Sequence, residues 1–170
     1  ITKDVRIYPI SIATLNTKVD ILAPSVGLFL YGPYVLEDKL EYTKYNNTSG
    51  ATALVSGTVG LMFSLNPCLP HTQVESILKL TSTNIDHIKA NTPYKGHYGA
   101  GAMNSGEAVK AVYTLYNEKE KTIFENQFFE RWDFELTSYS QELVFKDIAF
   151  VKDAKLEIEA KHSIVLKPGV

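Results

Sequence analysis

The sequence lacks features that several protein classes require. Its 170 residues include one cysteine, Cys68, which excludes an internal disulfide framework and a cysteine-rich zinc site. Neither sign of charge prevails, because 17 basic and 19 acidic residues give a formal net charge of -2. The chain therefore lacks a basic surface for nucleic acid or an anionic membrane, and no run approaches the roughly 20 apolar residues of a membrane-spanning helix. We expect no nucleic-acid partner, no membrane span, and a Cys68 that fills space in the core.

The composition predicts a globular chain in two parts. Hydrophobic residues make up 45% of the sequence and aromatic residues 11%, and a chain of this length buries roughly two thirds of the surface that it exposes when unfolded. A polar run at 117–121 interrupts the apolar pattern, so we expect domains at 1–117 and 118–170. The sequence begins at Ile1 rather than at a methionine, and we expect it to be a piece of a longer protein.

The first part opens with strand-like runs and an apolar helix. The runs at 18–24 and 26–31 predict two short strands. The segment 49–65 is apolar on nearly every face, which predicts a buried helix. Its glycines each cost a helix about 1 kcal/mol, so we expect close packing against other elements there.

Two further helices have recognisable start signals. The spacing of Thr72 and Glu75 is typical of a capping box, and Asn104 is expected to cap a third helix. The apolar stripe of the second helix is expected to comprise Val74, Ile77, Leu78 and Leu80. After residue 117, the runs 132–136 and 155–160 alternate apolar and polar residues, which indicates half-buried strands and a mostly β second part.

A Thr-Ser pair lies at a helix start, a position that suits a catalytic nucleophile. Thr48 and Ser49 open the apolar helix, so their hydroxyls stand near unpaired helix N–H groups and the positive end of the helix dipole. This geometry suits an oxyanion beside a nucleophile. The alternative is that Ser49 only caps the helix, which is the commoner role of a serine at such a position.

Four segments in chain order resemble the C-terminal half of a subtilisin-like serine protease (subtilase) domain. They are Val19–Pro24, Asn46–Gly57, Asn66–Pro67 with its following helix, and Tyr98–Asn104. The family pattern around the nucleophile reads Asn-Gly-Thr-Ser-x-Ala-x-Pro-His-Val-x-Gly, and the matching residues are Asn46, Thr48, Ser49, Ala51, Val55 and Gly57. The resemblance implies an α/β fold class: the C-terminal part of a subtilisin-like parallel-sheet domain at 1–117, then a small all-β module at 118–170.

The resemblance also implies a reaction. Ser49 is the nucleophile of a serine endopeptidase and forms an acyl-enzyme, its backbone N–H donates to the oxyanion, and Thr48 supports the oxyanion. The family order is aspartate, histidine, serine, so the other triad members are expected in an N-terminal part or a separate chain, which is the predicted partner besides the peptide substrate. This chain alone is then expected to be inactive.

The remaining ionisable residues are not expected to act in catalysis. All four histidines follow Ser49 in the chain, which is the wrong order for the family's base, and none has the helical spacing of a metal site; they are His71, His87, His97 and His162. We therefore expect no metal and no cofactor. Asp20 is interpreted as buried or as a loop anchor, because it lies in the family's structural strand.

Three departures from the family pattern favour a second interpretation. Asn47 stands in place of glycine, Ala53 in place of proline, and Leu54 in place of histidine. They favour a catalytically inactive subtilase-like scaffold that acts as a surface interaction module. The upstream sequence would distinguish the two, because an active enzyme keeps all of its catalytic motifs.

The end of the chain carries a second resemblance. Residues 145–150 and 154–170, with the closing Ile164-Val165-Leu166-Lys167-Pro168-Gly169-Val170, resemble the stacked short-strand repeats of exported proteins in the Bacteroidetes. This resemblance implies a secreted or cell-surface protein. The alternative is any small antiparallel sheet with one polar face.

Overall fold

The structure is a computed structural model that describes residues 15–26, 28–31, 42–45 and 47–169. A two-stranded antiparallel hairpin comes first, with strands β1 (Leu28–Tyr31) and β2 (Tyr42–Tyr45). Helices follow, and then five strands. The helical elements are α1 (Thr48–Leu65), α2 (His71–Leu80), the short 3-10 helix η1 (Lys89–Tyr94) and α3 (Ser105–Leu115). The strands are β3 (Lys121–Phe129), β4 (Asp133–Ser138), β5 (Glu142–Phe150), β6 (Lys155–Ala160) and β7 (Ser163–Leu166).

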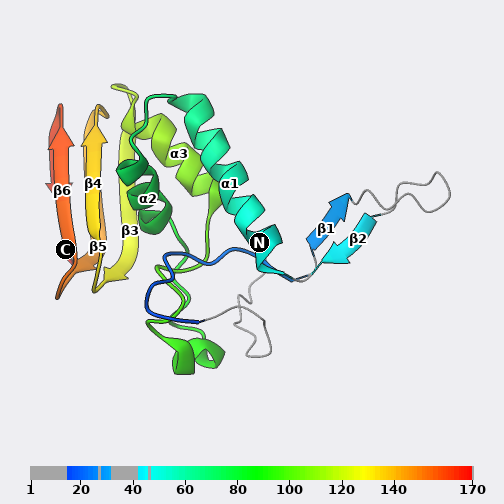
Figure 1. Ribbon diagram of the computed structural model, residues 1–170. Helices are drawn as coiled ribbons and strands as arrows, with labels where there is room; N and C mark the ends of the chain where they lie inside the picture. Colours follow the sequence, from blue (N-terminus) through cyan, green and yellow to red (C-terminus); the bar gives the residue numbers. More distant parts are fainter. Residues whose placement is uncertain (1–14, 27, 32–41, 46, 170) are drawn as a thin grey trace.

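The five C-terminal strands form two small sheets in which every neighbouring pair is parallel. One sheet has the order β3-β5-β7 and the other β4-β6. The chain alternates between the sheets, so β3 and β4 make one layer, β5 and β6 the next, and β7 begins a third (Figure 1). Lys121 lies beside Glu142, and Glu142 lies beside Ser163. The alternation at 132–136 and 155–160 thus predicted strands correctly, but the strands β3 to β7 pair parallel and not as the alternative antiparallel sheet.

The core lies between the helices and the first strand layers. A single cluster contains buried residues of α2 and α3 together with aromatic residues of β3, β4 and β5. Four aromatic rings form a chain of edge-on or tilted contacts, with centroids 4.6 to 6.4 Å apart in each contacting pair; they are Phe129, Trp132, Phe134 and Phe150. The cluster spans both sides of residue 117. The division into two domains at that residue stays a prediction.

Helix α1 is far less buried than its sequence predicts. Only Gly50, Thr58 and Met62 are buried, although the helix is 18 residues long. One side packs on α3, where the hydroxyls of Thr58 and Ser105 lie 2.8 Å apart. The expectation of burial on nearly every face is therefore wrong for this chain, because no described element covers the opposite side.

The same helix bears on the expected absence of a membrane span. Among the described residues, α1 is long and apolar enough to cross a membrane by length and composition, with a mean hydropathy of 1.2. One such helix is a weak indication, because core helices of soluble proteins meet the same criterion. The absence of a span stays a prediction.

The helix start signals give mixed results. Asn104 caps α3 as predicted, and its side chain accepts the Glu107 N–H at 3.2 Å. The capping box of α2 is wrong: the helix begins at His71 after Pro70, which offers no side-chain cap. Glu75 instead pairs with Lys79 one turn later. The predicted apolar stripe of α2 is buried throughout.

Smaller expectations about the first part also need correction. Residues 18–24 form no regular strand, although Leu22 makes an isolated parallel bridge with Ala102. Strand β1 does lie in the predicted run 26–31. Cys68 is exposed rather than a filler of the core. It sits in the tight turn between α1 and α2, where its neighbour Leu69 takes the buried position.

Candidate active site

Ser49 lies in the first turn of α1. The helix begins at Thr48, and its N-cap is Asn47, whose side chain accepts the Gly50 N–H at 2.8 Å. Ser49 is therefore not the cap, and its exposed side chain is left free for another role. Asn47 has φ -154°, an extended conformation open to any residue. Asparagine in place of the family's glycine therefore causes no backbone strain here.

The environment of Ser49 suits a developing negative charge. The N–H groups of the first helical turn have no partner within the helix, and the helix dipole adds a partial positive charge at this end. Thr48 and Ser49 are both exposed, and no acidic residue lies in the first turn. The Thr48 carbonyl accepts the Thr52 hydroxyl at 3.0 Å, a bond within the helix that leaves both N-terminal hydroxyls unaffected.

The structure does not bring a base to Ser49. No hydrogen bond joins Ser49 to a histidine or carboxylate of the described residues. All four histidines are exposed; His71 begins α2, His87 and His97 lie in loops, and His162 lies in the bend between β6 and β7 rather than on a strand. Among the described residues, no group of three or more His, Cys, Asp or Glu side chains is placed to hold a metal ion.

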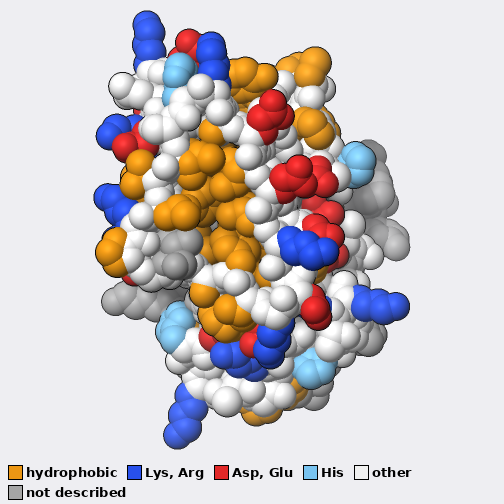
Figure 2. Space-filling view, turned by 90° about the vertical axis from the view of Figure 1, so that its left-hand side faces the viewer, with side chains coloured by type: hydrophobic (Ala, Val, Ile, Leu, Met, Phe, Trp, Pro, Cys, Tyr) orange, Lys and Arg blue, Asp and Glu red, His pale blue; other side chains and the backbone are white. Residues whose placement is uncertain are grey.

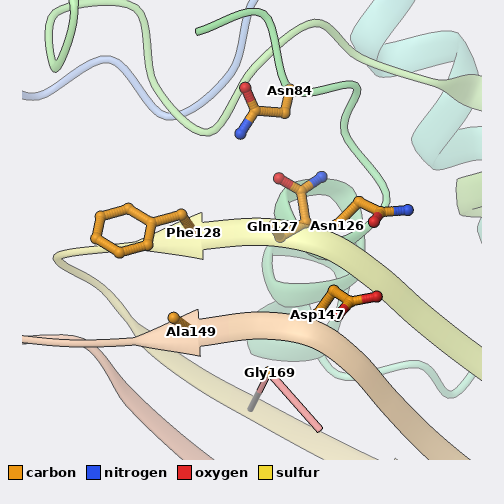
Figure 3. Close-up of a pocket in the computed structure, with 7 residues that line it drawn as sticks. All are labelled: Asn84, Asn126, Gln127, Phe128, Asp147, Ala149 and Gly169. Carbon is orange, nitrogen blue, oxygen red and sulfur yellow. The ribbon is translucent and has the colours of Figure 1, made fainter. Parts of the chain in front are cut away.

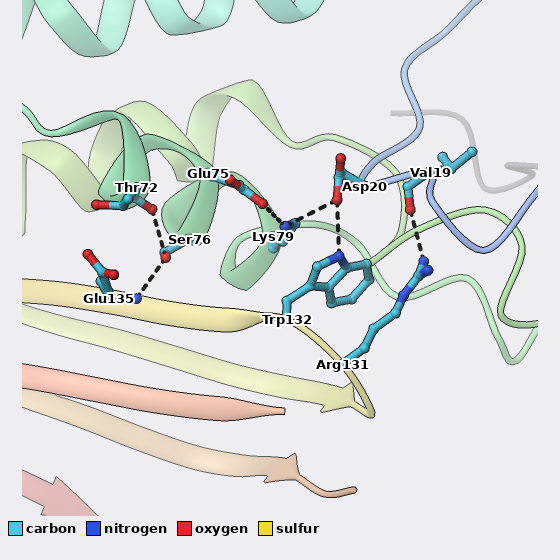
Figure 4. A network of polar contacts seen from close by, with 9 residues as sticks. All are labelled: Val19, Asp20, Thr72, Glu75, Ser76, Lys79, Arg131, Trp132 and Glu135. Atoms are coloured by element: carbon cyan, nitrogen blue, oxygen red, sulfur yellow. Dashed lines mark hydrogen bonds and ion pairs between the residues drawn. The ribbon is translucent and has the colours of Figure 1, made fainter. Parts of the chain in front are cut away.

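Asp20 anchors a network that ties the first part of the chain to the strands. Its carboxylate accepts the Trp132 indole N–H at 3.0 Å and lies 3.2 Å from the Lys79 ammonium (Figure 4). Lys79 is only 1% exposed, and it also pairs with Glu75 and lies 4.7 Å from the centre of the Trp132 ring. The prediction of a loop anchor matches these contacts, although the Asp20 side chain is half exposed rather than buried.

Arg131 extends this network to the backbone. Its guanidinium stacks 4.2 Å from the centre of the Trp132 ring and donates to the Val19 carbonyl at 2.9 Å. Burial lowers the pKa of Arg131, and the charge of Asp20 acts in the opposite direction. Sequence reasoning missed Lys79, Arg131 and Trp132. The one signal in the sequence was the position of Lys79, a basic residue beside the apolar stripe in the last turn of α2.

The segment around Tyr98 packs tightly against the same backbone. Ala100 N–H donates to the Asp20 carbonyl at 2.9 Å, and Met103 N–H donates to the Leu22 carbonyl at 2.7 Å. Gly99 has φ +79°, and a Cβ there would lie 2.4 Å from the Asp20 carbonyl carbon, so only glycine fits. Tyr98 donates to Asp86, and burial together with this carboxylate raises the tyrosine's pKa.

A shallow hollow lies elsewhere, over strands β3 and β5. It measures about 370 Å³ and includes Gln127, whose Oε1 is buried without a partner. Its side chains diverge: Asn126 and Asp147 point one way and Phe128 the other (Figure 3). Divergent groups do not define a ligand, and this hollow contains none of the candidate catalytic residues.

Comparison with known proteins identifies a family for the first part of the chain. The model of the subtilase family matches residues 8–101, which is more than half of the chain and includes Thr48 and Ser49. No curated protein and no solved structure gives a significant match. The family match ends shortly before α3 and includes no residue of the strands β3 to β7.

Proposed function

Because the chain belongs to the subtilase family, we propose that it is the C-terminal part of a serine endopeptidase in which Ser49 is the nucleophile. Membership of the family supports a serine peptidase function. The observation that carries the assignment to Ser49 is its exposed position in the first turn of α1, inside the matched segment and next to a cap made by another residue.

In the proposed reaction, Ser49 Oγ attacks the carbonyl carbon of the scissile peptide bond. A histidine takes the hydroxyl proton and later gives it to the leaving amine, and an aspartate orients that histidine. The backbone N–H of Ser49 donates to the oxyanion, and Thr48 supports it through its hydroxyl. The acyl-enzyme on Ser49 is then hydrolysed by water, which restores the serine.

The histidine and aspartate are proposed to come from an N-terminal part of the same protease, on the same or a separate chain. The open side of α1 supports this partner. Leu54, Leu61 and Leu65 recur at spacings of seven and four residues, so they share one face, and each is at least 40% exposed. Gly57 has no atom within 4 Å of where a Cβ would stand. An apolar helix face with a glycine gap suits close packing by another element.

It follows that the 170-residue chain alone hydrolyses nothing at a useful rate. A serine without its base retains only background acceleration. We propose that the complete protease is secreted or displayed at the cell surface, and that the strands after residue 117 form an accessory module. Support for this location comes from the resemblance of the closing residues to repeats of exported proteins.

A second candidate function is an inactive subtilase-like scaffold that serves as an interaction module. Leu54 favours it, because a leucine stands where the family commonly has histidine, and its side chain is 40% exposed near the start of α1. Ala53 departs from the family in the same turn. An apolar surface close to Ser49 would suit protein binding as well as substrate contact.

Labelling with a fluorophosphonate probe tests the two functions. The form to treat is the longer protease that carries the aspartate and histidine segments, and peptide mass spectrometry locates the adduct. Only an activated serine reacts quickly, so the enzyme predicts labelling at Ser49 that Ser49→Ala abolishes. Ser56→Ala is the matched control, because Ser56 is an exposed serine of the same helix. A folded, fully processed protein that stays unlabelled would establish the scaffold instead.

A further inference from the structure

Helix α2 carries a row of polar side chains that is buried. Gln73, Ser76 and Lys79 follow one another at intervals of three residues, so they lie in one row along the helix. A row of this composition is typical of a solvent-facing side, yet the three residues are only 5%, 2% and 1% exposed. Their hydrogen bonds show what covers them: the row meets β4, one of the strands β3 to β7 that we call the strand stack.

Ser76 takes the place of a neighbouring strand for β4. Among the described strands, β4 pairs with β6 alone. On its other side, the Glu135 backbone N–H donates to the Ser76 hydroxyl at 3.0 Å, and this hydroxyl donates to the Thr72 carbonyl at 2.9 Å (Figure 4). A backbone N–H that is shielded from water needs a partner, and here a helix side chain supplies it.

The other two side chains of the row bind β4 and the turn before it. The Gln73 amide group donates to the Thr137 hydroxyl at 2.7 Å, and its carbonyl accepts the Tyr116 hydroxyl at 2.8 Å. The Lys79 ammonium lies 4.7 Å from the centre of the Trp132 ring. The polar groups of the row therefore exchange water for partners on the strands and on α3, which is the condition for burying them.

Helix α3 meets the other sheet of the strand stack in the same way. Thr114 near the end of α3 is 8% exposed, and its hydroxyl accepts the hydroxyl of Thr122 on β3 at 2.9 Å. The Tyr139 N–H, directly after β4, donates to the Leu115 carbonyl at 2.7 Å. Both strands of the first layer thus contact a helix. Strand edges that a helix covers are closed to pairing with other strands.

The first layer is in turn tied to the second. Lys121 of β3 lies 2.9 Å from Glu142 of β5, and Glu125 of β3 lies 3.4 Å from Lys146 of β5. On the strand side of the molecule, charged side chains of both signs border an apolar band (Figure 2). In stacked structures each layer contacts only its neighbours, so stability passes from layer to layer. Whatever holds the first layer therefore acts on the later ones.

We propose that α2 and α3 are the cap of the strand stack, so that the strands fold onto these helices and are not stable without them. Stacked repeats need a cap at the end of the stack, and the buried polar row of α2 supplies one. Helix α2 lies within the segment that matches the subtilase family. The family part of the chain thus serves as the folding surface for strands that lie outside the match, whether or not Ser49 is reactive.

Hydrogen exchange of the 170-residue chain tests the proposal. Ser76→Ala leaves the Glu135 N–H without its partner, so exchange should become about tenfold faster or more along both β4 and β6. The matched control is Ser64→Ala, because the exposed Ser64 hydroxyl bonds within α1, to the Leu61 carbonyl. This control should leave exchange in β4 and β6 unchanged. Faster exchange confined to Glu135 in Ser76→Ala overturns the proposal, because the strands would then hold their fold without the cap.

A milder variant on α3 gives the same test if Ser76→Ala fails to fold. Thr114→Val keeps the shape of the side chain but removes the hydroxyl that Thr122 bonds. Exchange should become faster along β3 and also along β5, which the cap reaches only through β3. Thr52→Val is the control, since Thr52 is exposed and bonds the Thr48 carbonyl of its own helix. Unchanged exchange in β5 of Thr114→Val overturns the proposal.

Unfolding in urea distinguishes the cap from a strand domain that folds by itself after the polar run at 117–121. Trp132 is the one tryptophan of the sequence, and it lies where the strands meet α2, so its fluorescence reports this junction. Circular dichroism reports the helices. The two signals should share one midpoint, because parts that depend on each other unfold together, and Ser76→Ala should lower both equally. Two separate transitions overturn the proposal.

Discussion

Helices α1 and α2 follow one another in the chain but differ sharply in how they are covered. Seven of the ten residues of α2 are buried, including a lysine, whereas three of the eighteen residues of α1 are buried. The more apolar helix is thus the more exposed one. Because the free energy of burial follows the apolar area removed from water, α2 holds this chain together, and the apolar side of α1 is available to a partner.

The contrast separates the element that stabilises the fold from the element that carries the proposed nucleophile. Helix α2 closes one end of the strand stack and contributes Lys79 to the Asp20 network. Helix α1 presents Ser49 at its exposed first turn and packs on α3 along one side only. Substitutions on the two helices should therefore separate effects on folding from effects on assembly.

The largest expected effect is on the buried helix. Ile77→Ala should lower the free energy of unfolding by about 2–5 kcal/mol, because Ile77 is 0% exposed and its loss leaves a cavity. Leu61→Ala on α1 should change it by no more than about 0.5 kcal/mol, since the side chain is 56% exposed. Urea unfolding measures both, and equal losses would contradict the contrast between the helices.

The Lys79 network gives the next largest effect. Lys79→Met keeps an apolar stem but removes the ammonium from Asp20, Glu75 and the Trp132 ring. We expect a loss of about 1–2 kcal/mol, which is less than for a fully buried ion pair because both carboxylates are half exposed and regain water. Thermal unfolding measures it. Lys110→Met, at an exposed pair on α3, is the control and should have almost no effect.

The cap of α1 comes third. Asn47→Ala removes the side chain that accepts the Gly50 N–H, so we expect a loss of about 1 kcal/mol. Asn47→Asp should preserve most of the stability, because aspartate caps equally well and adds a favourable charge at the helix start. Chemical unfolding with helical circular dichroism as the probe distinguishes the variants. An alanine variant as stable as the original would mean that the end of α1 frays without cost.

The sequence predicted the helices and strands better than it predicted how they pair and pack. Local signals were sufficient for the three helices, for the Asn104 cap and for the strands at 133–138 and 155–160. The resemblance at the end of the chain implied stacked short strands, but the residues did not predict their parallel pairing, because those in one column differ in type, as Thr122, Leu143 and Ile164 do. The ladder consists of backbone hydrogen bonds, which leave no side-chain repeat to read.

The candidate site shows the same division. The position of Ser49 at a helix start followed from local spacing, and its assignment as nucleophile from the resemblance to subtilases. The Asp20 network was not predictable, because it joins Asp20 to Trp132, residues far apart in the chain. The exposure of α1 was not predictable either, since an apolar helix looks the same in sequence whether or not its partner is present.

The smallest expected effect is that of Gly57→Ala. The substitution should stabilise the 170-residue chain but weaken its association with the N-terminal part of the protease. In the 170-residue chain, Gly57→Ala should stabilise the fold by about 0.5–1 kcal/mol, because alanine favours the helix and the added Cβ meets no atom within 4 Å. In the assembled protease, the same methyl should obstruct the element that packs against α1 and weaken the association of this chain with the N-terminal part. Thermal unfolding measures the change in stability, and titration of this chain with the N-terminal part measures the change in association.

Ala53→Gly serves as the reverse control for helix propensity, because it lies in the same exposed helix. If Gly57→Ala binds the N-terminal part as tightly as the original chain, the glycine gap is not a packing site, and the partner covers α1 only through its leucines.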